Sequence, residues 1–388
     1  MARKLQANWT TYHKEGSKFV QYISSFDYWQ ILSLFVLLGT GLIFIYSTGV
    51  QSGNEGFFHR QLFWVCVSIP VYIIFSHADS RLWEIIAEPF FIISLLLLVL
   101  VLIFGTKISG AKRWLDLGFF NFQPSEVAKL SLIVILGKLL SFPKFDINKF
   151  SVLLLAGGLV LLPFVLIFIE PDLGSALLLL PCSGVMLLAA GLNRKWIFSV
   201  VGAIIIFGAL FGANEYFKVK PLLRNYHKAR IKAFLYPEDA PSDMTYQQRQ
   251  SELAVGSGGL YGKGLGKGTQ HALGYLPQSA ANNDFIFSVI AEEWGFFRSF
   301  GLLCVFLLLC LRILYTSYHA ENKFSCYVTL GIGTLFFSQI LININVNVGL
   351  APVTGLVLPF VSYGGSFLVV GMAAAGIVQS VWRNRVKD

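Results

Sequence analysis

Runs of about 20 apolar residues recur along the whole chain, and this repetition limits the possible folds more than any other feature. A helix of that length crosses the hydrocarbon core of a bilayer, where the backbone must satisfy its hydrogen bonds internally. Charged residues make up only 13% of the 388 residues, against about a quarter in a typical soluble domain. The sequence therefore predicts an all-α polytopic membrane protein and argues against a soluble core.

Ten of these runs qualify as transmembrane helices. They lie at residues 29–49, 61–77, 85–105, 124–142, 150–169, 174–192, 195–214, 285–314, 325–348 and 365–382. We therefore expect a cytoplasmic N-terminal segment at 1–28, a ten-helix membrane domain at 29–382 and a cytoplasmic tail at 383–388. The longest polar stretch, residues 216–283 between the seventh and eighth helices, is predicted to form a large extracellular loop.

The orientation follows from Lys and Arg in the short loops, because positive charge is retained on the cytoplasmic side. An even number of spans places both termini on one side, where fifteen Lys and Arg lie against four opposite. Both termini are thus predicted to be cytoplasmic. Three of the four outward charges fall in residues 106–118, which we interpret either as an anchor for lipid phosphates or as a phosphate-binding patch.

The net charge of +9 does not indicate a nucleic-acid partner, because Lys and Arg gather at the ends of the apolar runs. The five cysteines lie within or at the edges of those runs. They have no CxxC metal-binding spacing, and we expect them to behave as small apolar side chains. The chain begins with about 25 mainly polar residues, which is unlike a cleavable signal peptide.

Two pairs of charged residues stand out near helix ends. Glu126 and Lys129 are three positions apart, so they share one helix face. Ionisable groups inside a membrane usually pair or face a cavity, so we expect a structural ion pair, a polar cavity wall, or both. Glu170 and Asp172 lie in an outward turn, where they are either solvated acids or groups that bind a divalent ion or order the nearby basic loop.

The long loop ends in a glycine-rich stretch at residues 256–270, which contains seven glycines together with Lys263 and Lys267. Glycine lets backbone N–H groups approach a phosphate, and lysine supplies charge. This pattern predicts a phosphate-binding loop, with a flexible linker as the alternative. Asp284 follows at the start of the eighth span, where it is either a helix N-cap or a general base or metal ligand at the membrane surface.

An uncharged segment broken by Pro and Gly, residues 349–367, joins the last two spans. Irregular backbone at membrane depth is tolerated only where protein or a cavity covers it. We therefore predict that this segment is re-entrant or lines a cavity.

Seven pieces of the sequence, in order, resemble the SEDS family (shape, elongation, division and sporulation). They are GAKRWLDLG, FQPSEVAK, EPDLGSA, the basic stretch around Tyr226 and Arg230, YQQRQSELAVGSGGLYGKGLGKGT, NDFIFSVIAEEWG and PVTGLVLPFVSYGGS. The GAKRW loop and the LPF form are more similar to the elongation branch than to the division branch. The chain departs from the family pattern at Trp294, at Phe367 and at Asn345, which lies within the unusual series Asn343, Asn345 and Asn347.

The resemblance implies a peptidoglycan glycosyltransferase of the bacterial cytoplasmic membrane. Such an enzyme joins lipid II to the nascent glycan strand at the outer face of the membrane, during cell elongation and shape maintenance. The implied partners are a class B penicillin-binding protein acting as transpeptidase, the elongation machinery and membrane lipids, with no nucleic acid. The candidate cofactor is a divalent cation, Mg²⁺ or Mn²⁺.

Carried over by motif, Asp284 is the expected catalytic residue, which would take the proton from the 4-hydroxyl of the acceptor sugar. The expected substrate-binding residues are Arg113, Glu126, Lys129, Asp172, Arg230, Gln250, Ser257 and Lys263. Their cationic members would stabilise the leaving pyrophosphate. Two other functions stay open: a lipid II flippase, which needs no outward base, and a non-catalytic scaffold for the penicillin-binding protein.

Overall fold

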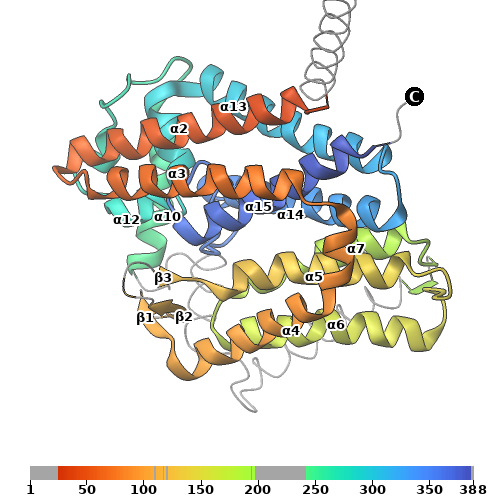
Figure 1. Ribbon diagram of the computed structural model, residues 1–388. Helices are drawn as coiled ribbons and strands as arrows, with labels where there is room; N and C mark the ends of the chain where they lie inside the picture. Colours follow the sequence, from red (N-terminus) through yellow and green to blue (C-terminus); the bar gives the residue numbers. More distant parts are fainter. Residues whose placement is uncertain are drawn as a thin grey trace, which may run out of the picture.

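The computed structural model describes residues 25–108, 111–116, 118, 121–193, 195–196 and 242–385. Its long helices are α2 (Tyr28–Ser52), α3 (Gly56–His77), α4 (Ser80–Phe104), α5 (Pro124–Ser141), α6 (Phe150–Ile169), α7 (Leu173–Ala189), α13 (Ile286–Tyr318), α14 (Lys323–Asn347) and α15 (Gly365–Arg383). The shorter helices α10 (Ser242–Ser257), α11 (Thr269–Ala272) and α12 (Gln278–Asn282) precede α13. The long helices pack into a bundle (Figure 1).

The long helices coincide with nine of the predicted spans. Among the described residues, seven helices are long and apolar enough to cross a membrane, so the chain is a multi-pass membrane protein. The other two are α5, which carries three charged residues, and α7, which has 17 residues. The predicted span at 195–214 lies mostly outside the described residues, and the count of ten stays a prediction.

The last helix, α15, is buried along most of its length and packs against α3 (Figure 1). Small residues make this close packing possible, as they do between membrane helices in general. A Cβ atom on Gly376 would lie 2.7 Å from the Cβ atom of Phe75, and one on Gly365 would lie 2.3 Å from the Trp64 ring. The start of α15 is therefore held directly against α3.

The segments that join the helices at one end of the bundle include a small sheet. Strands β1 (Thr106–Ile108), β2 (Ala111–Asp116) and β3 (Asn121–Phe122) pair antiparallel in the order β1-β2-β3. Figure 1 shows the strands at the same end as α10 and α12. The prediction of an all-α chain is therefore wrong for this loop, whose β-branched and aromatic residues favour paired strands.

Helix α13 is kinked at Gly295, which has φ 73° and ψ −174°. Most residues before the kink are buried, including Glu292 and Glu293, whereas the longer second part has many exposed apolar side chains. At the kink, a Cβ atom on residue 295 would lie 2.1 Å from the backbone nitrogen of Gly262. Glycine is therefore required at this position both by the conformation and by the contact.

Candidate active site

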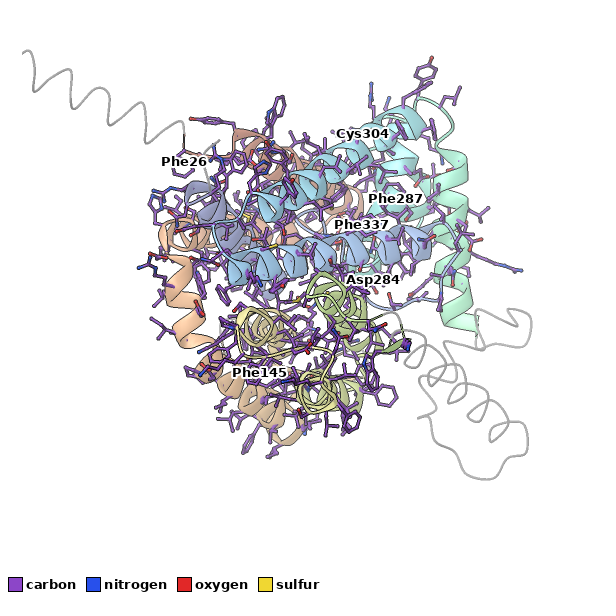
Figure 2. The ribbon with its side chains drawn as sticks, turned by 90° about the vertical axis from the view of Figure 1, so that its right-hand side faces the viewer. Phe26, Phe145, Asp284, Phe287, Cys304 and Phe337 are labelled. Carbon is purple, nitrogen blue, oxygen red and sulfur yellow. The ribbon has the colours of Figure 1, made fainter. Side chains whose placement is uncertain are left out.

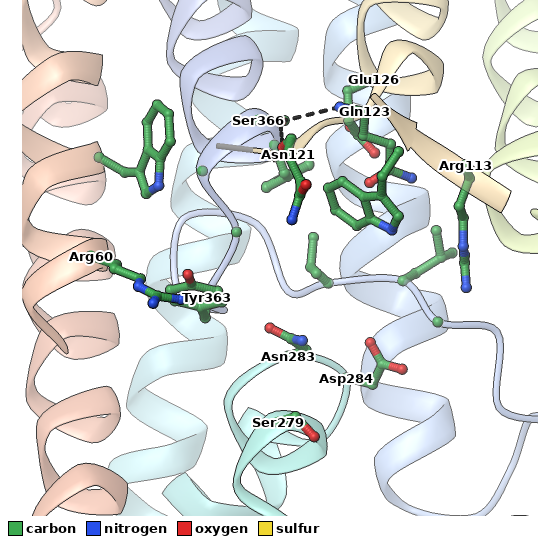
Figure 3. A pocket seen from close by; sticks show the side chains of 18 of the residues that line it. Arg60, Arg113, Asn121, Gln123, Glu126, Ser279, Asn283, Asp284, Tyr363 and Ser366 are labelled. Atoms are coloured by element: carbon green, nitrogen blue, oxygen red, sulfur yellow. Dashed lines mark hydrogen bonds between the residues drawn. The ribbon is translucent and has the colours of Figure 1, made fainter. Parts of the chain in front are cut away.

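A cavity of about 1100 Å³ lies at the end of the bundle that carries the sheet and α12 (Figure 3). Its walls come from α3, β2, β3, the starts of α5, α7 and α15, from α10, α12 and α14, and from the segments before α13 and before α15. The polar and charged lining residues include His59, Arg60, Arg113, Asp116, Gln123, Glu126, Gln247, Asn283, Asp284, Gln339 and Tyr363. The cavity thus joins residues from almost the whole described chain.

The segment at residues 349–367 forms one wall of this cavity. Val353, residues 355–357 and residues 363–367 line it. The prediction that this irregular segment lines a cavity is therefore confirmed.

Asp284 stands between α12 and α13 and lines the cavity (Figure 2). Phe285 occupies the N-cap position of α13, and no side chain makes a capping hydrogen bond there. The interpretation of Asp284 as an N-cap is therefore wrong. Figure 3 shows its carboxylate directed into the cavity, as a general base requires.

Asp172 holds the basic loop against the bundle. Its carboxylate lies 3.4 Å from Arg113 Nη1 and accepts a hydrogen bond of 3.0 Å from Gln123 Nε2. It also accepts from the backbone N–H of Ser175, which caps α7. Arg113 and Gln123 line the cavity, and Asp172 is 1% exposed behind them. Of the interpretations of this acid, the one in which it orders the basic loop is confirmed.

Glu126 and Lys129 form the predicted ion pair. Lys129 Nζ donates to Glu126 Oε1 at 2.9 Å, and the lysine side chain is 1% exposed. Pro124 starts α5, where its missing N–H costs no helical hydrogen bond. Glu126 lines the cavity, so the pair is both a structural contact and part of the cavity wall. Lys129 acts on the cavity through Glu126.

Glu170 lies fully buried in the turn between α6 and α7. Among the described residues, neither of its carboxylate oxygens has a hydrogen-bond partner. Burial, reinforced by the nearby Asp172 and opposed by Arg113, raises the pKa of Glu170 to about 9. Glu170 is therefore a neutral carboxylic acid at pH 7, and the prediction of a solvated acid is wrong here.

The glycine-rich loop binds carboxylates of its own chain where phosphate was predicted. The backbone N–H groups of Thr269 and Gln270 donate to Glu292 Oε1, and that of Gly266 donates to Glu293 Oε2. Ser47 and Gln51 also donate to Glu293. These contacts attach the glycine-rich loop to the part of α13 that precedes the kink at Gly295.

Three further predicted binding residues, Gln250, Ser257 and Lys263, do not line the cavity. Lys263 Nζ lies 2.6 Å from Glu292 Oε1, so its charge is paired with a carboxylate of α13. Gln250 is half-buried in α10, and the exposed Ser257 donates to the Ala254 carbonyl. Arg230 lies outside the described residues. Substrate contacts by these residues stay predictions.

Several cavity residues were missed from the sequence. Arg60 was counted among the four outward charges, and nothing else in its surroundings indicated a site. His59, Arg60 and Trp64 line the cavity from α3, and Tyr363, before α15, packs against Phe57 of α3. Placing these residues in the cavity requires knowing that α15 packs against α3, which the sequence pattern alone does not indicate.

The described residues contain no group of three or more His, Cys, Asp or Glu side chains arranged to hold a metal ion. Mg²⁺ is commonly held by one or two carboxylates together with substrate phosphates. Asp284 and Glu126 are carboxylates that line the cavity, so the residues present fit a cation that is bound jointly with an anionic substrate.

Comparison with known sequences gives consistent matches over nearly the whole chain. A sequence model of the FtsW/RodA/SpoVE family, described as "cell cycle protein", matches residues 28–387. The "Probable peptidoglycan glycosyltransferase FtsW" of Trichlorobacter lovleyi is 35% identical over 375 residues, covering 92% of this chain and 93% of that protein. The "Peptidoglycan glycosyltransferase MrdB" of Escherichia coli K12 is 34% identical over 357 residues, with the same coverage. Relatives named FtsW and relatives named MrdB therefore both match.

Solved structures are also similar to this chain over most of its length. A chain in a structure titled "Structural coordination of polymerization and crosslinking by a peptidoglycan synthase complex" has a TM-score of 0.77 at 28% identity, covering 94% of this chain and 99% of that one. The rod shape determining protein RodA of Thermus thermophilus has a TM-score of 0.69 at 27% identity, covering 94% and 98%.

Proposed function

The chain belongs to the SEDS family of cell cycle proteins, the family of FtsW, RodA and SpoVE, and on this premise we propose that it is a peptidoglycan glycosyltransferase. It polymerises lipid II into glycan strands at the outer face of the bacterial cytoplasmic membrane, with both termini in the cytoplasm. The observation that carries the proposal is the placement of Asp284, Arg113 and Arg60 on different walls of one cavity.

The size of the cavity suits a reaction between two head groups. Pockets for a single small ligand usually measure about 300–1,000 Å³, and this one measures about 1100 Å³. It has room for the sugar and pyrophosphate of a donor beside the sugar of an acceptor. The lipid tails would remain in the bilayer.

In the proposed reaction, Asp284 takes the proton from the 4-hydroxyl of the acceptor sugar. The acceptor oxygen forms a bond to the anomeric carbon of the donor, and the bond between that carbon and the pyrophosphate oxygen breaks. The pyrophosphate leaves with the bonding electrons. Arg113 and Arg60 face the cavity and would stabilise its negative charge, since guanidinium groups bind phosphate through two hydrogen bonds.

A divalent cation stays part of the proposal. Asp284 and Glu126 are the cavity carboxylates that would hold it together with the substrate phosphates. When bound, it would neutralise part of the charge of the pyrophosphate.

The proposed partner is a class B penicillin-binding protein, and the proposed role is in elongation. The structural match to a peptidoglycan synthase complex, whose title joins polymerisation to crosslinking, supports such a partner. The similarity to RodA supports the elongation role.

The test is glycan-strand formation from labelled lipid II by the full chain with its penicillin-binding partner and a divalent cation. Loss of a general base lowers rates by about 10²–10⁴-fold, so we expect Asp284→Asn to fold normally and to polymerise at least about a hundredfold more slowly. Normal polymerisation by this variant would disprove the assignment of the base. If the wild type and Asp284→Asn both move labelled lipid II across the liposome membrane, and neither forms polymer, the result would favour a flippase.

A further inference from the structure

The backbone of Asp284 is held by two side chains of another helix. The amides of Asn343 and Asn347, one turn apart on α14, both donate to the main-chain carbonyl oxygen of Asp284, each at 2.9 Å. A carbonyl oxygen has two lone pairs, so these bonds use its full accepting capacity. We refer to the two amides as the asparagine clamp.

The asparagine clamp also binds parts of the structure on either side of Asp284. Asn347 Oδ1 accepts a hydrogen bond of 3.0 Å from the backbone N–H of Ser288, in the first turn of α13. Asn343 Nδ2 donates to the carbonyl of Leu356, in the cavity wall, at 2.7 Å. The clamp therefore joins the base, the helix that follows it and the neighbouring part of the cavity wall at Leu356.

The two residues before Asp284 are held in the same way. The carbonyl of Asn282 accepts from the backbone N–H of Tyr363 at 2.8 Å, and the carbonyl of Asn283 accepts from Ser362 Oγ at 2.6 Å. Three successive carbonyls are thus fixed by the C-terminal part of the chain. A short side chain such as Asp then has little freedom beyond its two torsion angles.

We infer that Asn343 and Asn347 are positioning residues for glycosyl transfer, which fix the backbone of Asp284 so that its carboxylate meets the acceptor hydroxyl. The inference rests on the proposed role of Asp284 as the base. A general base acts when it lies about 2.6–3.2 Å from the atom whose proton it takes. A displacement of about 1 Å can cost a hundredfold in rate.

The positions of the two asparagines agree with this role and not with substrate binding. Asn343 is 1% exposed and Asn347 is 0% exposed, and neither lines the cavity. Their side chains act on the reaction through the backbone of Asp284. Replacing them should therefore change the rate of the bound complex more than the affinity for substrate.

Asn345 provides a matched control on the same helix. Its side chain is half-buried, and its amide donates to the carbonyl of Leu341 within α14 at 2.7 Å. The experiment compares Asn343→Ala, Asn347→Ala, the double variant, Asn345→Ala and Asp284→Asn in polymerisation of labelled lipid II. Folded protein is quantified by thermal unfolding in detergent, and rates are expressed per folded molecule.

We expect each single clamp variant to lower kcat about tenfold and the double variant about a hundredfold, with KM changed less than about twofold. Asn345→Ala should behave as wild type. A normal kcat per folded molecule in the clamp variants, with only a lower unfolding temperature, would overturn the inference. Each single variant retains one hydrogen bond to the Asp284 carbonyl, so we expect both to fold. If neither folds, the asparagines are required for folding and the inference of a positioning role is overturned.

The same assay separates this inference from the proposed function. If Asp284→Asn polymerises normally, the assignment of the base is wrong and the positioning role falls with it. If Asp284→Asn is inactive while the clamp variants keep their kcat, only the positioning role is wrong.

Discussion

At the scale of single residues, the cavity presents two guanidinium groups, from Arg113 and Arg60. Asp172 holds Arg113 in place, while Arg60 stands in the first turn of α3, next to the exposed His59. Glu170, in contrast, is buried without a hydrogen-bond partner among the described residues. We therefore expect the two arginines to contribute to the affinity for an anionic substrate, and Glu170 to affect the stability of the fold.

Substitution of Arg60 by Gln should weaken substrate binding. A hydrogen bond to a charged group contributes about 1.5–3 kcal/mol, and 1.4 kcal/mol corresponds to tenfold in affinity. We therefore expect Arg60→Gln to raise the KM for lipid II about tenfold or more, with a smaller effect on kcat. Arg81→Gln, at an exposed position at the start of α4, is the control. An unchanged KM would remove Arg60 from the site.

Glu170 should make stability depend on pH. Its pKa is about 9 in the folded state against 4.5 for the free group, so folding favours the protonated form. The resulting stabilisation is complete below about pH 4.5 and is lost as the pH rises through 9.

The neutral variant Glu170→Gln should therefore unfold at the same temperature as wild type near pH 5. At pH 9 it should be more stable by several kcal/mol, because each unit by which folding raises the pKa of Glu170 above 4.5 corresponds to about 1.4 kcal/mol. Thermal unfolding in detergent from pH 5 to 9 measures this, with Glu321→Gln at an exposed position as the control. Parallel curves for Glu170→Gln and wild type would contradict the assignment of the raised pKa.

At the scale of elements, the helices follow from apolar runs, and nearly every predicted span has its helix. The positions of Asp284 and of residues 349–367 on the cavity wall were also predictable, because charge at a span end and broken backbone each indicate a cavity. The carboxylate partners of the glycine-rich loop were not predicted, and its binding of phosphate stays a prediction. Its glycines and lysine suit any anion, and the anions nearest in space are the side chains of Glu292 and Glu293.

The kink in α13 allows the glycine-rich loop to reach these carboxylates, and only glycine permits it. Gly295→Ala would place a Cβ atom 2.1 Å from Gly262 N at a φ of 73°. We expect a loss of at least about 2 kcal/mol in the free energy of unfolding. Gly301→Ala, in the same helix with no atom within 4 Å of the new Cβ, should be near neutral. Equal stability of the two variants, measured by thermal unfolding, would contradict this account.

At the scale of the whole molecule, the cavity lies at one end of the bundle, and the start of α2 and the end of α15 lie at the other (Figure 1). The end near Asp27 carries ion pairs such as that of Asp27 with Arg312, and the sheet and α10–α12 lie at the other end (Figure 1). The small sheet was missed because its strands have only two to six residues, too few for a clear alternating pattern.

The predicted orientation can be tested with a membrane-impermeant maleimide on intact cells. In a background without the native cysteines, Tyr261→Cys should be labelled from outside, because Tyr261 is 76% exposed at the cavity end. Tyr318→Cys, 85% exposed at the end of α13, should be labelled only after the cells are opened. Labelling of Tyr318→Cys in intact cells, with Tyr261→Cys labelled only after opening, would place the cavity on the cytoplasmic side of the membrane.

The charges around the cavity have a consequence for how substrate arrives. Arg113 is paired with Asp172 and Glu126 with Lys129, while Arg60 lines the cavity together with Asp116 and Asp284. Such a near-neutral opening exerts little long-range attraction on an anion. A substrate tethered in the membrane has no need of it, because diffusion within one leaflet already delivers its head group at the right depth. Capture would then depend on the lateral density of substrate in the leaflet and only weakly on the ionic strength of the surrounding water.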